Sequence, residues 1–311
     1  MSARRLVSGV ALGLLLTAAV AGAAPNWQRA APLPDERTEV AAAVVSGEIA
    51  IVGGFLADGS SSGRVDLYSP PRGRWRRGPD LPVAVNHSSA AGYRGRLYVV
   101  GGYADSIGRG NILRAAYVLE RGRWRALPRP PEGRAAAGAA IVRDRLYVVG
   151  GVGPGGLARR ALLFDLKRGR WSTAPGPTPR EHLAVTAVGG RVYALGGRLA
   201  GIDTNVARME SFSPGARRWL SLPPIPHPRG GTGAAAVGGE IVSVGGEEPG
   251  GTIASVYAYN VASRRWRQLE DLPSPRHGLG VAAVASRVYA IAGGGRPGLF
   301  VSSANEVLEL R

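Results

Sequence analysis

Short apolar segments alternate with turn residues along most of the chain, and this pattern repeats at intervals of 47 to 49 residues. In one unit, an apolar segment is followed by the turn Arg143-Asp144, and a second segment is closed by Gly150-Gly151. The four segments of this unit are residues 135–142, 145–149, 161–165 and 170–172. Short segments between regularly spaced turns predict antiparallel β-strands. We therefore expect an all-β fold built from four-stranded units.

Tryptophans and glycine pairs mark the same period. The six tryptophans are Trp27, Trp75, Trp124, Trp171, Trp219 and Trp266. The glycine pairs are Gly53-Gly54, Gly101-Gly102, Gly150-Gly151, Gly196-Gly197, Gly245-Gly246 and Gly293-Gly294, the last being one residue late with Ala292 in its first slot. Five tryptophans follow an aromatic residue by seven positions: Tyr68, Tyr117, Phe164, Phe212 and Tyr259. A tryptophan can bury a large ring between sheets, and glycine allows positive φ and close backbone approach.

Four strands in a unit of this length are typical of a β-propeller blade. A glycine pair after an apolar strand such as Leu97-Tyr98-Val99-Val100, followed by an aromatic residue and a tryptophan, resembles the kelch repeat. The resemblance covers residues 25–311 and implies a six-bladed kelch-type β-propeller. The expected blades are residues 35–77, 83–126, 132–173, 178–221, 227–268 and 274–311, with 25–29 added to the last.

The two ends of the repeat region predict how the ring of blades closes. Trp27 comes before the first glycine pair and belongs to no preceding unit, whereas residues 307–311 form a third strand with no fourth strand after it. We therefore expect the N-terminal strand to pair with the C-terminal blade and to supply its fourth strand. This pairing would remove two open sheet edges.

The first residues have the pattern of a bacterial export signal. Arg4 and Arg5 give a positive start, residues 6–20 are apolar, and Ala21-Gly22-Ala23 fits a cleavage site. We expect residues 1–23 to be a signal peptide and residues 24–311 to be a periplasmic or secreted propeller with no membrane span. An uncleaved anchor is the alternative, because the apolar run is near the lower limit for crossing a bilayer. The general secretory route is favoured over the twin-arginine route.

Composition narrows the possible chemistry. The 311 residues include no cysteine, which excludes disulfides, thiolate metal ligands and cysteine nucleophiles. It also sets aside the copper-radical chemistry of the similar galactose oxidases, which needs a tyrosine crosslinked to cysteine. The formal net charge is +17, and Lys167 is the only lysine. Nucleic-acid binding is nevertheless disfavoured, because export removes that partner and no recognition fold is present. We expect a monomer with no cofactor.

Alignment of the units places arginine at the start of the innermost strand in five of six blades. This arginine column consists of Arg37, Val85, Arg134, Arg180, Arg229 and Arg276. Because innermost strands line the central channel, we expect these guanidinium groups to crowd one mouth and to bind a carboxylate or phosphate there. The alternative is structural, since Pro-Arg at this position resembles the ordinary kelch pattern, in which arginine hydrogen-bonds loop carbonyls. A second set of arginines precedes the tryptophans and is expected on a solvated rim: Arg74, Arg123, Arg170, Arg218 and Arg265.

Histidines and carboxylates gather at the same end of the blades. His87, His182 and His277 follow the arginine column by one or two residues, and Glu39 and Glu181 occupy adjoining slots. His87 and His277 join the five arginines as predicted ligand-binding residues, whereas Glu181, His182 and Glu39 are the best candidates for a general acid or base. A metal site is not expected, because the histidines have arginine neighbours and no clear carboxylate partner.

Two functions fit these features. The first is a non-enzymatic binding or interaction module for an anionic small molecule, a carboxylate-bearing glycan, or an acidic peptide or protein. The channel mouth and the variable loops after the glycine pairs would hold this ligand, although Glu247-Glu248 in one loop is expected to be solvated. The alternative rests on resemblance, since some exported kelch propellers are sialic-acid mutarotases, and it implies a periplasmic sugar mutarotase or epimerase. The sequence favours the binding module, which needs only a scaffold and loops.

Overall fold

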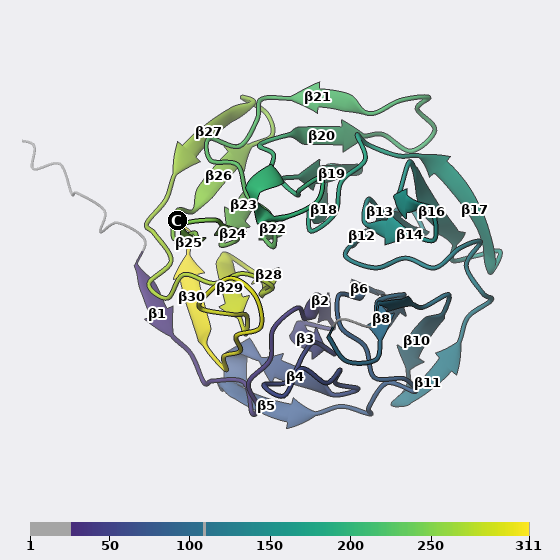
Figure 1. The fold of residues 1–311 in the computed structure, drawn as a ribbon, viewed down its shortest axis with the longest axis horizontal. Coiled ribbons are helices and arrows are strands. Elements are labelled where there is room, and N and C mark those ends of the chain that lie inside the picture. Colours follow the sequence, from purple (N-terminus) through teal and green to yellow (C-terminus); the bar gives the residue numbers. More distant parts are fainter. Residues whose placement is uncertain (1–25, 108–109, 311) are drawn as a thin grey trace, which may run out of the picture.

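The computed structural model describes residues 26–107 and 110–310. Their strands form six four-stranded antiparallel sheets, which are arranged as blades around a common centre (Figure 1). The predicted fold class, a six-bladed β-propeller, is confirmed. The segment expected to be an export signal, residues 1–23, lies outside the described residues. Within the described ranges, no helix combines the length and apolar character needed to cross a membrane.

Within each of the first three blades, the strands follow one another from the centre of the wheel to its rim (Figure 1). Blade one contains β2 (Ala41–Val45), β3 (Glu48–Val52), β4 (Val65–Ser69) and β5 (Arg74–Arg77), with η1 (Pro70–Arg72) before β5. Blade two contains β6 (Ser89–Tyr93), β7 (Arg96–Val100), β10 (Ala116–Glu120) and β11 (Arg123–Ala126). Blade three contains β12 (Gly138–Val142), β13 (Arg145–Val149), β16 (Arg160–Asp165) and β17 (Arg170–Pro175).

The other three blades repeat this order, and small ribbons occupy several connecting loops. Blade four contains β18 (Ala184–Val188), β19 (Arg191–Leu195), β20 (Met209–Phe212) and β21 (Leu220–Leu222), with η2 (Ile202–Thr204) after β19. Blade five contains β22 (Gly233–Val237), β23 (Glu240–Val244), β26 (Tyr257–Asn260) and β27 (Arg265–Gln268). Blade six contains β28 (Gly280–Val284), β29 (Arg287–Ile291), β30 (Asn305–Glu309) and β1 (Trp27–Arg29). The loop ribbons are β8 (Tyr103–Ala104) with β9 (Asn111–Ile112), β14 (Val152–Gly153) with β15 (Gly156–Leu157), and β24 (Glu247–Glu248) with β25 (Gly251–Thr252).

Closure of the wheel joins the two ends of the repeat region. Strand β1 pairs antiparallel with β30, so that Trp27 lies opposite Leu308 and Arg29 lies opposite Glu306. The predicted closure by the N-terminal strand is therefore confirmed. It leaves each of the six blades with four paired strands and no blade lacking its outer strand.

The tryptophans connect neighbouring blades through their indole groups. Five of the indole Nε1 groups donate to a backbone carbonyl that lies 43 to 45 residues before the tryptophan, and Trp27 donates across the closure. The acceptors, for Trp27 to Trp266 in chain order, are the carbonyls of Glu270, Ala31, Pro79, Pro128, Pro175 and Pro223. Each ring also buries apolar surface. Because every blade makes this contact once, the tryptophans recur with the period of the blades.

The glycine in the second slot of each pair, which is Gly293 in the sixth blade, donates a hydrogen bond to the next blade. Gly102 has φ +99°, and its N–H donates to the Arg134 carbonyl at 2.8 Å. A Cβ at Gly102 would lie 2.6 Å from the Asn86 carbonyl oxygen, so the close approach requires glycine. The other five donor–acceptor pairs are Gly54–Val85, Gly151–Arg180, Gly197–Arg229, Gly246–Arg276 and Gly293–Arg37. The glycine pairs and the arginine column thus belong to one inter-blade contact.

The hydrophobic core consists of layers between adjacent blades. In one layer, Val52 and Val65 of blade one pack with Leu97 and Val99 of blade two. The innermost strands carry mostly alanine and valine toward the centre, and the middle residues of all six strands line one axial cavity of about 280 Å³. These small side chains leave a narrow channel along the axis, whose loop-bearing end holds the candidate site.

Candidate functional site

The five arginines of the column do not line the channel mouth. They are at most 1% exposed, and each donates to the carbonyl of the first residue of the glycine pair in its own blade, 16 residues later. The donor–acceptor pairs are Arg37–Gly53, Arg134–Gly150, Arg180–Gly196, Arg229–Gly245 and Arg276–Ala292. The prediction that these side chains crowd an anion-binding mouth is wrong, and the structural alternative is correct.

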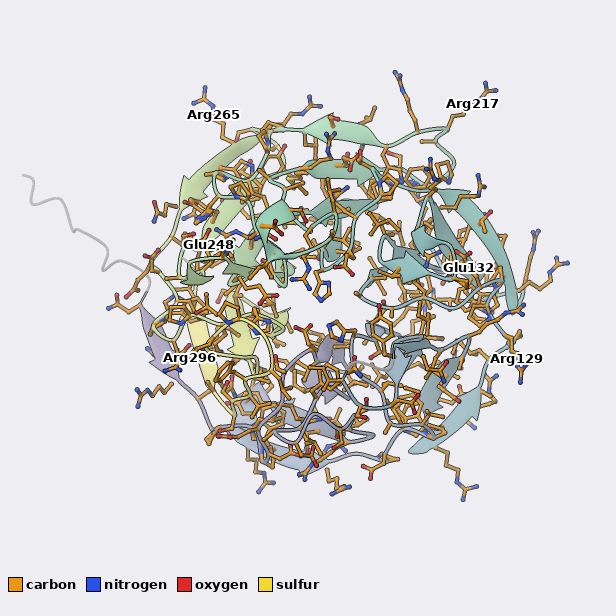
Figure 2. All side chains as sticks on the ribbon, in the orientation of Figure 1. Arg129, Glu132, Arg217, Glu248, Arg265 and Arg296 are labelled. Carbon is orange, nitrogen blue, oxygen red and sulfur yellow. The ribbon has the colours of Figure 1, made fainter. Side chains whose placement is uncertain are left out.

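Most of the buried guanidinium charges are neutralised by carboxylates of the same blades. Four of the five have carboxylate partners: Arg37 with Asp35 and Asp66, Arg134 with Glu132, Arg180 with Glu210, and Arg276 with Glu306. Arg229 instead donates to Ser255 Oγ at 2.7 Å, and burial lowers its pKa to about 10. Because a buried charge is tolerated when it is paired and hydrogen-bonded, no anionic ligand is needed to explain the column. By contrast, the arginines before the tryptophans are exposed as predicted, and Figure 2 shows Arg265 pointing away from the wheel.

Two residues after the arginine column lies a ring of six equivalent positions around the channel, which we call the inner ring. Its members are Glu39, His87, Ala136, His182, Gly231 and Gly278, all with φ between 50° and 64°. The backbone N–H of each later member donates to the carbonyl of the member before it at 2.9–3.0 Å, and Val40 closes the circle on Gly278 at 3.2 Å. Positive φ is unfavourable for residues other than glycine, and such strain concentrates at functional sites.

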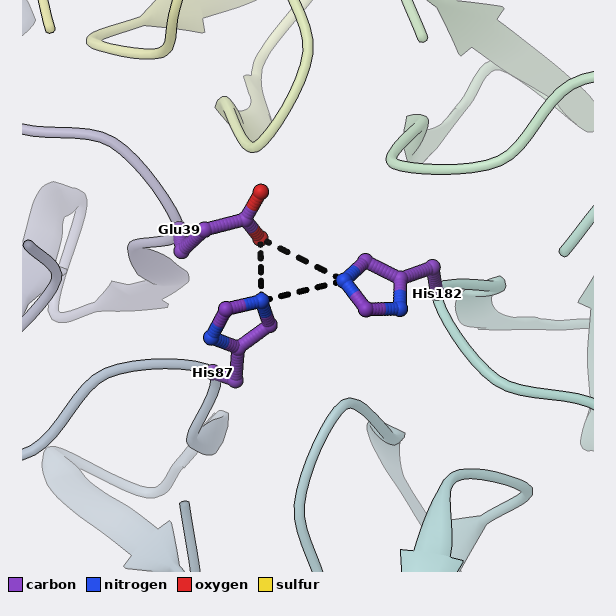
Figure 3. Close-up of side chains that lie close together, drawn as sticks. All are labelled: Glu39, His87 and His182. Carbon is purple, nitrogen blue, oxygen red and sulfur yellow. Dashed lines mark hydrogen bonds and ion pairs between the residues drawn. The ribbon is translucent and has the colours of Figure 1, made fainter. Parts of the chain in front are cut away.

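Three members of the inner ring carry reactive side chains that converge on one point (Figure 3). Glu39 Oε2 lies 3.1 Å from His87 Nε2, and His87 Nε2 lies 3.0 Å from His182 Nε2. The third separation, between Glu39 Oε2 and His182 Nε2, is 4.0 Å. Small residues at the other ring positions leave room for this cluster, since a Cβ at Gly278 would lie 2.6 Å from Glu39 Oε1.

The cluster is supported from behind by further polar side chains. His277 Nδ1 lies 3.1 Å from Glu39 Oε1, and His277 Nε2 lies 3.0 Å from the Arg296 carbonyl oxygen. Burial alone would lower the pKa of His277, but its hydrogen bond to Glu39 raises it. Burial alone would raise the pKa of Glu39, but the neighbouring His87 and the hydrogen bond with His277 hold it well below its usual range. Burial lowers the pKa of His87 to about 4, which leaves its ring neutral at pH 7.

Arg198 and Glu247 complete the polar floor, and the sequence reasoning did not find them. Arg198 donates to Glu181 Oε1 at 3.0 Å and to Glu247 Oε1 at 2.7 Å, and its Nη2 lies 3.0 Å from His182 Nε2. Burial alone would raise the pKa of Glu181, but hydrogen bonds with His182 and Arg198 lower it to about 2. Glu247, which we expected to be solvated, is 3% exposed.

A signal for these residues was present in the repeat. The residue directly after the glycine pair lines the pocket in five blades: Phe55, Tyr103, Val152, Arg198 and Glu247. This position starts the variable loop, and its backbone pairs with the residue after the arginine column, as in the bridge between Glu181 and Arg198. An alignment column at this position would have predicted the pocket lining.

The resulting pocket has a volume of about 540 Å³, within the range of ligand-binding pockets. Its walls include Phe55, Tyr103, Ile107, Ile112 and Leu299, so they are largely apolar. A smaller cavity of about 90 Å³ lies in the channel, and the cluster of Glu39, His87 and His182 lines both spaces. The arrangement can hold an apolar group between the loops while presenting polar atoms at its base.

The candidate residues are thus divided by the structure. Glu39, His87, His182 and His277 line the pocket, and Glu181 lies behind it in contact with His182 and Arg198. These five come from four different blades and from positions 39 to 277. Their roles in binding or catalysis stay predictions. The fourth histidine lies outside the cluster, where His227 Nε2 contacts Glu248 Oε2 at 2.8 Å.

Sequence comparison identifies the family of proteins to which this propeller belongs. The family described as the KLHDC2/KLHL20/DRC7 Kelch-repeats domain matches residues 39–225 and 129–295. The chain therefore belongs to the kelch-repeat family of β-propellers.

Similar proteins share the kelch repeat over different extents. Kelch-like protein terF of Aspergillus terreus is 31% identical over 254 residues, which is 69% of this chain and 53% of that protein. Kelch repeat protein M-T8 of Myxoma virus is 35% identical over 79 residues, or 25% of this chain and 15% of that protein. Kelch-like protein 36 of Mus musculus is 42% identical over 66 residues, or 21% of this chain and 11% of that protein. The chain spans about half the length of the first of these relatives and smaller parts of the other two.

Proposed function

We propose that this protein is a binding module that holds a partner protein or peptide on the loop-bearing face of the propeller. An apolar side chain of the partner would occupy the pocket of about 540 Å³, and the surrounding loops would contact the flanking residues. Kelch propellers generally mediate protein interactions, which supports this class of function.

The observation that carries the proposal is the distribution of exposed apolar side chains. Of the four large hydrophobic residues exposed in the described ranges, three lie in loops after glycine pairs: Ile107, Leu199 and Phe300, which are 52%, 49% and 44% exposed. Ile107 also lines the pocket. Apolar side chains gathered around a pocket mark interaction sites, because water leaves them favourably when a partner binds.

An anionic partner, the ligand class first inferred from the arginine column, is less well supported. The column arginines are buried, and Arg198 in the pocket is already bonded to Glu181 and Glu247. The floor also contains the carboxylate of Glu39, so acidic groups there outnumber the arginine. An apolar anchor is therefore the favoured feature of the partner.

A sugar mutarotase or epimerase is the alternative function. In its favour, Glu39, Glu181 and His182 lie within one network. Against it, the pKa of Glu181 is about 2 and that of Glu39 is also low, so both carboxyl groups are ionised at pH 7. An efficient general acid or base has a pKa near the working pH. These low pKa values count against proton transfer by either carboxyl group, so binding is the favoured function.

Peptide selection on the full propeller tests the proposed binding face. Selected peptides should share a large aliphatic or aromatic residue, and their affinity should fall at least about tenfold in the Ile107→Asp and Phe300→Asp variants, since buried interface anchors dominate affinity. Leu220→Asp is the matched control, because Leu220 is 47% exposed but lies on β21 at the rim (Figure 1). Unchanged affinity in both loop variants would contradict the proposal, as would failure to select any peptide.

We also propose that residues 1–23 direct export and are then removed, which leaves the propeller in the periplasm or outside the cell. The positive start, apolar run and small residues before Ala24 support this proposal. Expression of the full chain in a Gram-negative host should yield a periplasmic protein whose mass corresponds to residues 24–311. Recovery of the uncleaved chain in the membrane fraction would instead favour the anchor.

A further inference from the structure

The protonation of the two histidines in the cluster follows from their neighbours. Asn86 Nδ2 donates to Ser61 Oγ at 2.8 Å, which turns Asn86 Oδ1 toward His87 Nδ1 at 2.5 Å. Because this amide oxygen is an acceptor, Nδ1 of His87 carries the proton and Nε2 carries a lone pair. His182 Nε2 lies 3.0 Å from Arg198 Nη2, and because a guanidinium can only donate, His182 Nε2 also presents a lone pair.

Three electron-pair donors therefore face one another inside the channel mouth. Glu39 Oε1 is bonded to His277, which leaves Oε2 directed toward the two histidine nitrogens. The three donor atoms are separated by 3.0, 3.1 and 4.0 Å, and all three side chains are largely buried. Lone pairs brought this close repel unless a positive centre lies between them.

We propose that Glu39, His87 and His182 bind a divalent transition-metal ion of the zinc class. Metal–nitrogen and metal–oxygen bonds of about 2.0–2.2 Å in a tetrahedron place the ligand atoms roughly 3.3–3.6 Å apart, which lies within the range of the three separations. Two imidazoles and one carboxylate form a donor set suited to zinc, iron, cobalt or nickel rather than to calcium or magnesium. The cluster thus combines the distances and the donor chemistry of a metal centre.

The side chains behind the three ligands match the outer shell of metal sites. Metal-binding histidines commonly donate their other ring N–H to a carboxylate or carbonyl oxygen, which fixes the ring and the tautomer. Asn86 has this role for His87, and His277 holds the second oxygen of Glu39. The Glu181 carboxylate lies 3.1 Å from His182 Nδ1, on the side of the ring away from the cluster. Ligands supported in this way need only small shifts when the ion enters.

In the sequence, the arginine neighbours and the lack of a clear carboxylate partner disfavoured a metal site. The column arginines are buried within the blades, and Glu39 of blade one supplies the carboxylate. Arg198 Nη2 does contact His182 Nε2, and the ion would replace that contact. The bonds from Arg198 to Glu181 and Glu247 would remain, so the guanidinium keeps two carboxylate partners.

Three protein ligands leave at least one coordination position open. Structural zinc sites are closed by four protein ligands, whereas three ligands with an open position are typical of sites that exchange water or substrate. The cluster lines both the pocket and the smaller channel cavity, so the open position faces one of these spaces. The ion would therefore offer a coordination position to a donor atom of a ligand bound in that space.

Calorimetric titration of the chelator-treated, tag-free full chain with zinc chloride tests this proposal. We expect one equivalent to bind, and cobalt(II) at the same site should give the visible absorption of a four-coordinate ion. His87→Ala and His182→Ala should weaken zinc binding by at least about 100-fold, and Asn86→Ala by about tenfold through loss of ring support. His227→Ala is the matched control, because His227 pairs with Glu248 outside the cluster, and it should bind zinc like the unchanged chain.

Glu39→Gln covers the case in which an alanine variant does not fold. It keeps the size of the side chain and its acceptor for His277, but it removes the anionic ligand, so zinc affinity should fall at least about tenfold while the circular dichroism spectrum stays the same. A wild-type chain that binds no stoichiometric zinc or cobalt would overturn the proposal. Zinc binding that is unchanged in Glu39→Gln and in the folded histidine variants would also overturn it, since the ion would then lie elsewhere.

Discussion

Replacing Arg180 with alanine is expected to lower the free energy of unfolding by about 3–5 kcal/mol. The Arg180 side chain has no exposed surface, and it donates to the carbonyls of Thr178, Ala194 and Gly196 as well as to Glu210 Oε2 at 2.5 Å. Truncation would leave the Glu210 carboxylate buried without its cation and three carbonyls without a donor. An unpaired buried charge is among the most destabilising features of a folded protein.

Denaturation by guanidinium chloride, followed by tryptophan fluorescence, measures this effect. Arg267→Ala is the matched control, because Arg267 pairs with Glu240 at 2.6 Å on the surface and is half exposed. Exposed pairs contribute about 0–1 kcal/mol, so this variant should unfold near the unchanged protein. If Arg180→Ala retained full stability and lost only ligand affinity, the mouth-lining role first inferred from the sequence would be restored.

The fold could be predicted from the sequence because its physical causes are periodic. The tryptophans, the glycine pairs and the unpaired strand around Trp27 each report a contact that every blade makes, so their spacing fixed the blade number and the closure. The role of the arginine column could not be read in this way. Arginine is rarely buried, and burial here depends on partners such as Glu210 and Glu306, which lie 30 residues after their arginines and do not occur in every blade.

The candidate site was predictable in part. Glu39, His87 and His182 were found because they follow the arginine column by two residues, but the column alone did not show that they meet. Their contacts join blades one, two and four, and they arise from positive φ, which turns the side chains of the inner ring toward the axis. Arg198 was missed because the position after the glycine pair holds a different residue type in each of the first five blades, so no repeated residue marked it.

Replacing Gly54 with alanine is expected to lower the free energy of unfolding by about 2–5 kcal/mol. Gly54 is the second residue of its pair, has φ +101°, and donates its N–H to the Val85 carbonyl at 2.8 Å. A Cβ there would lie 2.5 Å from the Thr38 carbonyl oxygen and 2.6 Å from Val40 Cγ1. Both the backbone strain and the overlap with neighbouring atoms therefore act against the inter-blade contact.

Gly47→Ala separates these two effects, because Gly47 lies in the same blade with φ +80° and a Cβ there would meet no atom within 4 Å. Gly47→Ala should lower the free energy of unfolding by about 1 kcal/mol, from backbone strain alone. Position 292 gives an internal precedent, since alanine occupies the first slot of the sixth pair at φ 60°, whereas the second slot is glycine in all six blades. The inter-blade role of the second glycine would be wrong if Gly54→Ala and Gly47→Ala shifted the denaturation midpoint equally.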